Sequence, residues 1–153
     1  MEKTPLEILK QFWGYDDFKG SQEEIIAAVI EEQDVLALLP TGGGKSLCFQ
    51  LPALLKEGMC IVVSPLIALI HNQVEELKKK GIKALALTGG ISQDDIIDLL
   101  DNCLYGNYKF LYLSPERLKQ EISAGTYKVS PGQVADGILR EAVREHLALS
   151  DGE

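Results

Sequence analysis

The sequence predicts an α/β fold built on a parallel β-sheet. Helical patterns alternate with short apolar runs along the first 118 residues. These runs have the length and continuity of strands buried on both faces. Such alternation implies crossover connections, with helices that cover the sheet. Because ligands bind at the carboxyl ends of the strands in such sheets, each loop that follows a strand is a candidate site. The predicted strands are 35–39, 60–63, 84–87 and 110–113.

Capping signals locate the helices before and between these strands. Thr4-Pro5-Leu6-Glu7 is a capping box with proline at the first helical position, and Ser21-Gln22-Glu23-Glu24 is a second box. They predict one helix that ends near Trp13, before Gly14, and another that runs to about residue 30. Further helices are predicted over 46–56, from Ser64-Pro65 to about residue 80, over 92–104 and after Ser114-Pro115.

The composition is that of a globular protein of about one domain. The chain has 153 residues, of which 46% are hydrophobic and 25% are charged. Its net charge of −8 argues against a broad basic surface for nucleic acid, but not against a local basic groove. Three cysteines without CxxC spacing fit packing residues in a reducing cytoplasm rather than a disulfide or zinc site. The sequence shows no membrane span and no secretory pattern, so we expect a cytoplasmic protein.

The loop after the first predicted strand carries the clearest chemical signal. Glycine N–H groups and the start of the following helix can bind phosphate oxygens. Lys45 can reach the β- and γ-phosphates of ATP, and the Ser46 hydroxyl can bind Mg²⁺. Leu39 replaces the first glycine of the strict GxxxxGK[ST] motif, which leaves an xxTGxGKS form. A ligand-free glycine-rich turn and the loop of an unrelated kinase are the alternatives. The loop consists of Thr41, Gly42, Gly43, Gly44, Lys45 and Ser46.

A second signal, about twenty residues upstream of this loop, suits recognition of adenine. The amide of Gln22 can both donate and accept hydrogen bonds, which matches N6 and N7 of adenine. Tyr15 or Lys19 can cover the face of the base by stacking or by a cation–π contact. Alternatively, Gln22 is a solvated residue at the start of a helix.

Residues 9–118 resemble the first part of a RecQ-family DNA helicase. The matching segments are WGYDDFKGSQEEII, LLPTGGGKSLCFQLPALL, VVSPLIALIHNQVEEL and LYLSPERL. The resemblance implies the first RecA-like domain of a superfamily 2 helicase, an enzyme that uses ATP and Mg²⁺ to unwind DNA. It also implies that Gln22 reads adenine, with Tyr15 and Lys19 around the base. Lys19 stands where the family usually has arginine, which stacks better than lysine.

Two loops would face the backbone of single-stranded DNA if the resemblance holds. Each is also a plausible helix start with proline in the first turn, which is the alternative interpretation. The two roles are compatible, because a helix N-terminus binds anions. The candidate DNA contacts are Ser64, Pro65 and Leu66 in one loop, and Ser114, Pro115, Glu116 and Arg117 in the other.

Several parts that the family uses for catalysis do not occur in this sequence. The family's DEAH segment holds Mg²⁺ and orients the attacking water, and no Asp-Glu-x-His occurs here. The second RecA-like domain, its arginine finger and the zinc-binding region are also missing. We therefore expect ATP binding without hydrolysis or unwinding by this chain alone. In the family's sheet, the strand before the phosphate loop lies beside later strands, so 35–39 is expected to expose unpaired backbone and apolar surface.

The pattern changes after Leu118, which predicts two regions: an incomplete ATP-binding domain over 1–117 and a helical tail over 118–153. The capping box at 130–133 opens an amphipathic helix. Residues 118–147 resemble the C-terminal segment of the flagellar anti-sigma factor family. This resemblance implies an alternative function, a tail helix that binds a flagellar sigma factor. Otherwise, the helix simply caps the domain.

Overall fold

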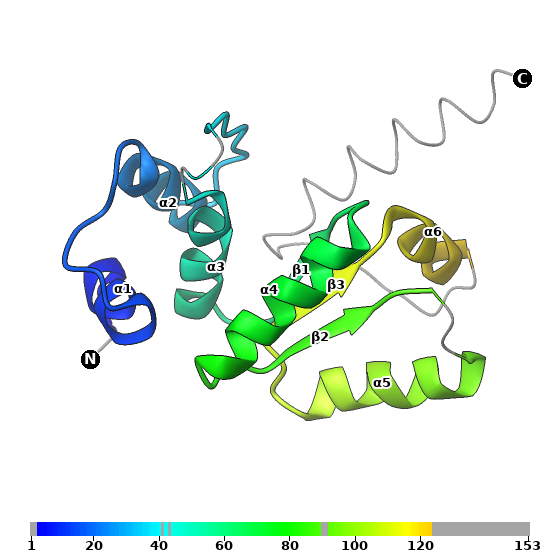
Figure 1. The fold of residues 1–153 in the computed structure, drawn as a ribbon. Coiled ribbons are helices and arrows are strands. Elements are labelled where there is room, and N and C mark those ends of the chain that lie inside the picture. Colours follow the sequence, from blue (N-terminus) through cyan, green and yellow to red (C-terminus); the bar gives the residue numbers. More distant parts are fainter. Residues whose placement is uncertain (1–2, 41, 43, 90–91, 124–153) are drawn as a thin grey trace, which may run out of the picture. The chain divides into compact units, whose positions relative to one another are not determined.

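The computed structural model describes residues 3–40, 42, 44–89 and 92–123 (Figure 1). The chain divides into two compact units, Met1–Gly58 and Met59–Glu153, and each has its own apolar core. The tail helix predicted from the capping box at 130–133 lies outside the described residues. Within the described ranges, no helix is long and apolar enough to cross a membrane.

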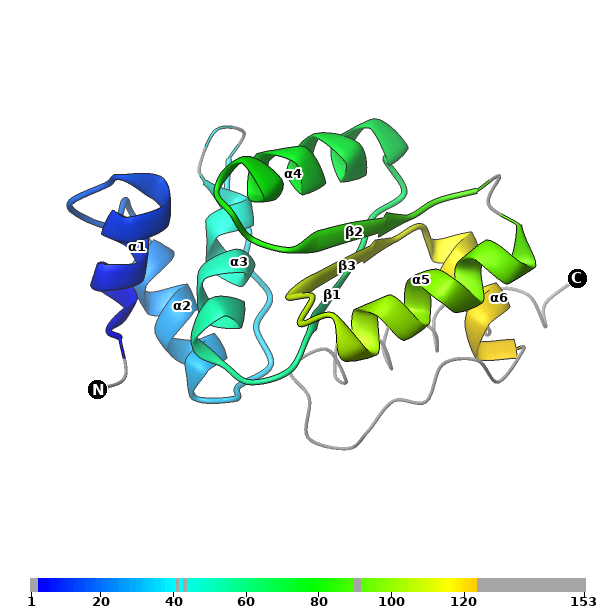
Figure 2. The ribbon, with the colours of Figure 1, turned by 90° about the horizontal axis from the view of Figure 1, so that it is seen from below.

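Three helices make up the described part of the first unit: α1 (Pro5–Trp13), α2 (Gln22–Ile30) and α3 (Lys45–Leu55). Both α1 and α2 pack against α3 (Figure 2). Apolar side chains at helical spacing face inward from each of them, as the periodicity predicts. The buried cluster consists of Ile8, Leu9, Ile26, Leu47 and Leu51.

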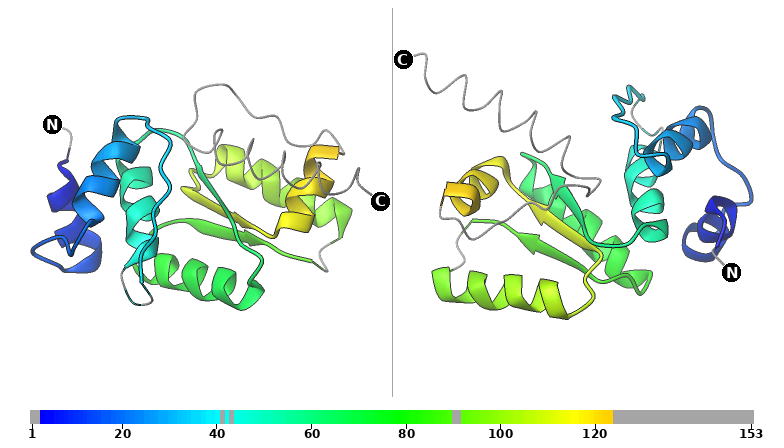
Figure 3. Two further views of the ribbon diagram at one scale, coloured as in Figure 1. Left: turned by 90° about the horizontal axis from the view of Figure 1, so that it is seen from above. Right: turned by 180° about the vertical axis from the view of Figure 1, so that it is seen from behind.

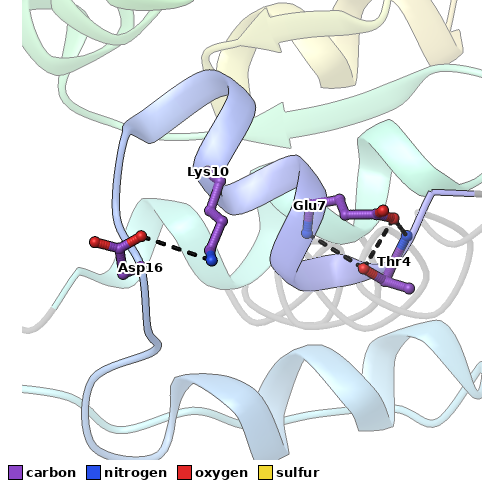
Figure 4. Close-up of polar contacts among 4 residues, drawn as sticks. All are labelled: Thr4, Glu7, Lys10 and Asp16. Atoms are coloured by element: carbon purple, nitrogen blue, oxygen red, sulfur yellow. Dashed lines mark hydrogen bonds and ion pairs between the residues drawn. The ribbon is translucent and has the colours of Figure 1, made fainter.

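The capping box at the start of α1 is confirmed (Figure 4). The backbone N–H of Glu7 donates to Thr4 Oγ1 at 3.3 Å, and the N–H of Thr4 donates to Glu7 Oε2 at 2.7 Å. The hydrogen bond from the Thr4 backbone, followed by that from its hydroxyl, lowers the pKa of the Glu7 carboxyl. Gly14 ends the helix at φ +71°, a left-handed backbone that favours glycine.

The prediction of a second capping box at Ser21 is wrong. Helix α2 begins where the pattern predicts, but Ser21 has φ −85° and ψ 11° and its side chain makes no capping hydrogen bond. A capping hydroxyl reaches the first-turn N–H groups from an extended backbone, which Ser21 does not have.

The strand predicted over 35–39 is also wrong, because these residues form no strand in the structure. The side chains of Leu36 and Leu38 are 89% and 88% exposed. A strand depends on hydrogen-bonded neighbours and on buried faces, so an apolar run without sheet partners does not become one. Among the described residues this segment belongs to no sheet, and the exposed side chains of Leu36 and Leu38 agree with the expected apolar surface.

The second unit contains a three-stranded parallel sheet within the described residues: β1 (Cys60–Val63), β2 (Ala84–Leu87) and β3 (Phe110–Leu113). The strand order is β1-β3-β2, so β3 pairs with both neighbours. All three strands were predicted at these residues, and the α/β class is confirmed.

Within the described part of this unit, three helices cover the sheet: α4 (Ile67–Lys79), α5 (Gln93–Tyr105) and α6 (Pro115–Ser123). Helix α4 lies on one face, and α5 and α6 lie on the other (Figure 3). Helix α4 begins three residues later than predicted, since Leu66 is still extended and its N–H donates to Ser64 Oγ at 3.3 Å. The buried cluster on the α5 face contains Leu87, Cys103, Leu111, Leu113 and Leu118.

The two serine/threonine residues before α1 and α2 should differ in their contribution to stability. We expect Thr4→Ala to lower the free energy of unfolding by about 1 kcal/mol, because it removes a capping hydrogen bond. Ser21→Ala is the matched control and should have little effect, since Ser21 makes no such bond. Urea unfolding of both variants gives the comparison. Equal losses of stability would contradict this account of the two caps.

Candidate functional site

The phosphate-loop sequence leads into α3 through a left-handed backbone. Gly42 has φ +79° and Gly44, the N-cap of α3, has φ +70°. Glycine reaches these angles without the strain that a Cβ brings. The N-cap residue Gly44 has no side chain that could bond to the first N–H groups of α3. These N–H groups and the positive end of the helix dipole can therefore bind an anion. Thr41 and Gly43 lie outside the described residues.

Lys45 and Ser46 are the first two residues of α3. Lys45 is exposed and Ser46 is partly exposed, so both lie at the accessible end of the helix. The described residues contain no group of three or more His, Cys, Asp or Glu side chains that could hold a metal ion. Magnesium commonly binds to one or two protein oxygens together with substrate phosphates and water. The Ser46 hydroxyl fits that mode of binding.

Gln22 joins the candidate adenine site to the candidate phosphate loop. Its side chain is buried, with 5% of its surface exposed. Its Oε1 accepts a hydrogen bond from the N–H of Lys19 at 2.9 Å, and its Nε2 donates to the carbonyl oxygen of Gly44 at 3.4 Å. Residues 22 positions apart in the sequence therefore lie in direct contact, and the interpretation of Gln22 as a merely solvated residue is wrong.

The other two adenine candidates lie together on the turn before α2. Lys19 Nζ lies 5.4 Å from the centroid of the Tyr15 ring, within the range of a cation–π contact. Both side chains are exposed. The backbone of Lys19 is bonded to the Gln22 amide, so this turn presents an aromatic ring and a cation close to that amide.

The cysteines have the properties of packing residues. Cys48, in the first turns of α3, donates a weak hydrogen bond to the Gly44 carbonyl over 3.8 Å. Burial raises the pKa of the Cys48 and Cys103 thiols and raises the pKa of Cys60 to about 12. Thiols with raised pKa values stay protonated at neutral pH and are poor nucleophiles and metal ligands.

In the second unit, three hydroxyl residues form a row along the carboxyl edge of the sheet. The strands end in register at Val63, Leu113 and Leu87. The next residues along the three strands are Ser64, Ser114 and Thr88. The strand order therefore places Ser114 between the other two.

The loops that follow β1 and β3 carry the other DNA candidates. Ser114 Oγ accepts a hydrogen bond from the N–H of Arg117 at 3.3 Å, which caps the start of α6. Glu116 is exposed and Arg117 is partly buried beside it. In the loop after β1, Pro65 and Leu66 are exposed to solvent.

Thr88 is a further hydroxyl residue on this edge, which no motif in the sequence singled out. It is buried at the end of β2, in the position that Ser64 and Ser114 occupy after β1 and β3. The signal was present in the sequence: each of the three apolar strands is followed directly by a hydroxyl residue. Only the strand order shows that these hydroxyl residues share one edge.

Comparison with known proteins identifies the family. The model of the DEAD/DEAH box helicase family matches residues 19–136, so the chain belongs to this family. It is 46% identical over 115 residues to the ATP-dependent DNA helicase RecQ of Synechocystis sp., covering 75% of this chain and 24% of that protein. It is also 46% identical over 112 residues to the probable ATP-dependent DNA helicase RecS of Bacillus subtilis, covering 72% of this chain and 22% of that protein. The chain thus spans about a quarter of the length of these relatives.

The solved structures support the fold assignment. A hypothetical ATP-dependent RNA helicase from Sulfolobus tokodaii superimposes with a TM-score of 0.60 over 80% of this chain and 37% of that chain. The sequence identity is 22%, so this likeness concerns the fold. The RecQ resemblance agrees with the relatives, whereas the anti-sigma resemblance of residues 118–147 stays a prediction.

The contact between Gln22 and Gly44 can be tested with two glycine variants. Both Gly42→Ala and Gly44→Ala place a side chain at positive φ, which costs about 1–2 kcal/mol. A Cβ at Gly42 meets open space, whereas a Cβ at Gly44 overlaps the amide nitrogen of Gln22. We therefore expect Gly44→Ala to lose more stability in urea unfolding and to shift the NMR signals of the Gln22 side-chain amide. If the two variants behave alike, the contact between Gln22 and Gly44 is wrong.

Proposed function

We propose that this chain is the ATP-binding portion of a RecQ-like ATP-dependent DNA helicase. The hydrogen bond between Gln22 and the Gly44 carbonyl carries the proposal, since it connects a candidate adenine-reading amide to a phosphate-type loop. Membership of the DEAD/DEAH box helicase family and the similarity to RecQ and RecS support it.

In the proposed site, α2 would bind the base of the nucleotide, and the start of α3 would bind its phosphates. Lys45 would neutralise the β- and γ-phosphates, with the N–H groups at the start of α3 beside it. Ser46 would contribute its hydroxyl to Mg²⁺, which screens the charge of the phosphates. Gln22 is already held by two backbone hydrogen bonds, so little side-chain entropy would be lost when it binds the base.

The carboxyl edge of the sheet is the proposed contact with single-stranded DNA. Ser64, Thr88 and Ser114 lie along that edge, and the start of α6 offers an anion-binding helix terminus beside Arg117. With a net charge of −8, the chain has no general attraction for phosphate, so we expect weak binding that depends on these few groups.

This stretch of sequence by itself would bind ATP without sustained hydrolysis. The sequence has no Asp-Glu-x-His segment to orient an attacking water. The relatives that are named helicases are much longer than this chain, and unwinding is proposed for proteins of their length.

Replacement of Lys45 tests the phosphate site. We expect Lys45→Ala to weaken binding of a fluorescent ATP analogue by at least about tenfold, because a charge-assisted contact with phosphate is lost. Chelation of Mg²⁺ should also weaken binding of the ATP analogue by the wild-type chain. Lys79→Ala is the control, since Lys79 is an exposed lysine paired with Glu76 in α4. Unchanged binding by Lys45→Ala would contradict the site, and sustained phosphate release by the wild type would contradict the expected lack of hydrolysis.

Replacement of Arg117 tests the DNA edge. We expect Arg117→Met to weaken binding of a labelled oligothymidylate and to lower the salt dependence of binding by about one phosphate contact. Lys119→Met is a matched control, because it removes the same charge from an exposed position of the same helix. Fluorescence anisotropy over a range of salt concentrations gives both quantities. If the two variants weaken binding equally, only net charge matters and the proposed edge is wrong.

A further inference from the structure

The lysine that follows α3 is unusually buried for its type. Only 16% of the Lys56 side chain is exposed. Its Nζ donates a hydrogen bond to the carbonyl oxygen of Val29 at 3.2 Å and forms an ion pair with Glu32 Oε1 at 3.4 Å. Burial of an ammonium group is costly unless it is paired and hydrogen-bonded, so these contacts are specific features of the fold.

The partner carbonyl belongs to the C-terminus of α2. Val29 is one of the last four residues of this helix, whose carbonyls lack partners within the helix. A cation at this end also interacts favourably with the helix dipole. The chain then turns through Glu32, a non-glycine residue at φ +64° whose N–H donates to the same carbonyl. Lys56 therefore binds a well-defined helix end.

Helices α2 and α3 are thus joined at both of their ends. Their first residues meet through Gln22 and Gly44, and their last residues meet through Val29 and Lys56. The two helices therefore run in the same direction, side by side (Figure 2). Ile26, Leu47 and Leu51 are buried between these two polar contacts. Because buried side chains interdigitate, a shift at one end of this pair is transmitted to the other.

We infer that Lys56 is a positioning residue for base recognition in the proposed nucleotide site. Its hydrogen bond to Val29 connects the C-terminal ends of α2 and α3 and so sets the relative position of the two helices. That position places the Gln22 amide against Gly44, which makes the adenine-reading group and the phosphate loop one site. The inference rests on the proposed function and adds a residue that itself touches neither base nor phosphate.

The hydrogen bond to Val29 is the important contact of Lys56. The Glu32 side chain is 73% exposed, and an ion pair with such a partner contributes little because water screens it. The carbonyl of Val29 is a partly buried partner, and its position is set by the backbone of α2. Loss of the ion pair alone should therefore have a small effect, whereas loss of the ammonium group should have a large one.

The test measures base discrimination, which is the ratio of the dissociation constants for Mg-GTP and Mg-ATP. We expect Lys56→Met to lower this ratio about three- to tenfold, while affinity for inorganic tripolyphosphate changes less than about twofold. Lys56→Arg keeps a donor at the helix end and should restore the ratio. Glu32→Gln and Lys79→Met should leave the ratio unchanged, the latter as a matched loss of a paired but exposed lysine.

A double variant separates positioning from general stability. In a Gln22→Ala background, Lys56→Met should have no further effect on the ratio, because the group that Lys56 positions is absent. If Lys56→Met does not fold by circular dichroism, the shorter and uncharged Lys56→Gln carries the same comparison. A variant that loses stability but keeps the wild-type ratio overturns the inference. A wild-type chain that does not prefer ATP to GTP overturns the proposed base recognition instead.

Discussion

The left-handed backbone of Gly44 is the constraint on which the first unit depends. Gly44 is the N-cap of α3, so its backbone sets the orientation of the first N–H groups of that helix. Because it has no Cβ, it also leaves room for the amide of Gln22. Any side chain at this position would both strain the backbone and displace Gln22. The proposed adenine reader, the phosphate loop and the start of α3 therefore depend on the absence of a single Cβ.

Two polar contacts and one apolar layer make α2 and α3 a single body. Gln22 and Lys56 act at opposite ends of the helix pair, and each of them donates to a backbone carbonyl of the other helix. Backbone carbonyls are dependable partners because their positions are set by the helix itself. In the proposed nucleotide site, the Gln22 amide and the start of α3 would therefore be positioned by packed helices.

In the second unit, the parallel register of the sheet has the corresponding role. Strand β3 pairs with both neighbours, so the three strands end at the same level. Ser64, Ser114 and Thr88 thereby become neighbours although they come from three different loops. The net charge of the chain is negative, so a proposed DNA contact here depends on a few aligned groups and not on a broad field.

Local signals in the sequence were sufficient for most elements, since their physical cause is local. The capping box of Thr4 and three of the predicted strands depend on neighbouring residues or on apolar periodicity. The run at 35–39 has the same local signal, but a strand also requires a neighbouring strand, and within the described residues this run forms no strand. The contact of Gln22 with Gly44, the row that includes Thr88 and the burial of Lys56 join distant residues. Such contacts follow from how helices and strands pack, and no local pattern specifies them.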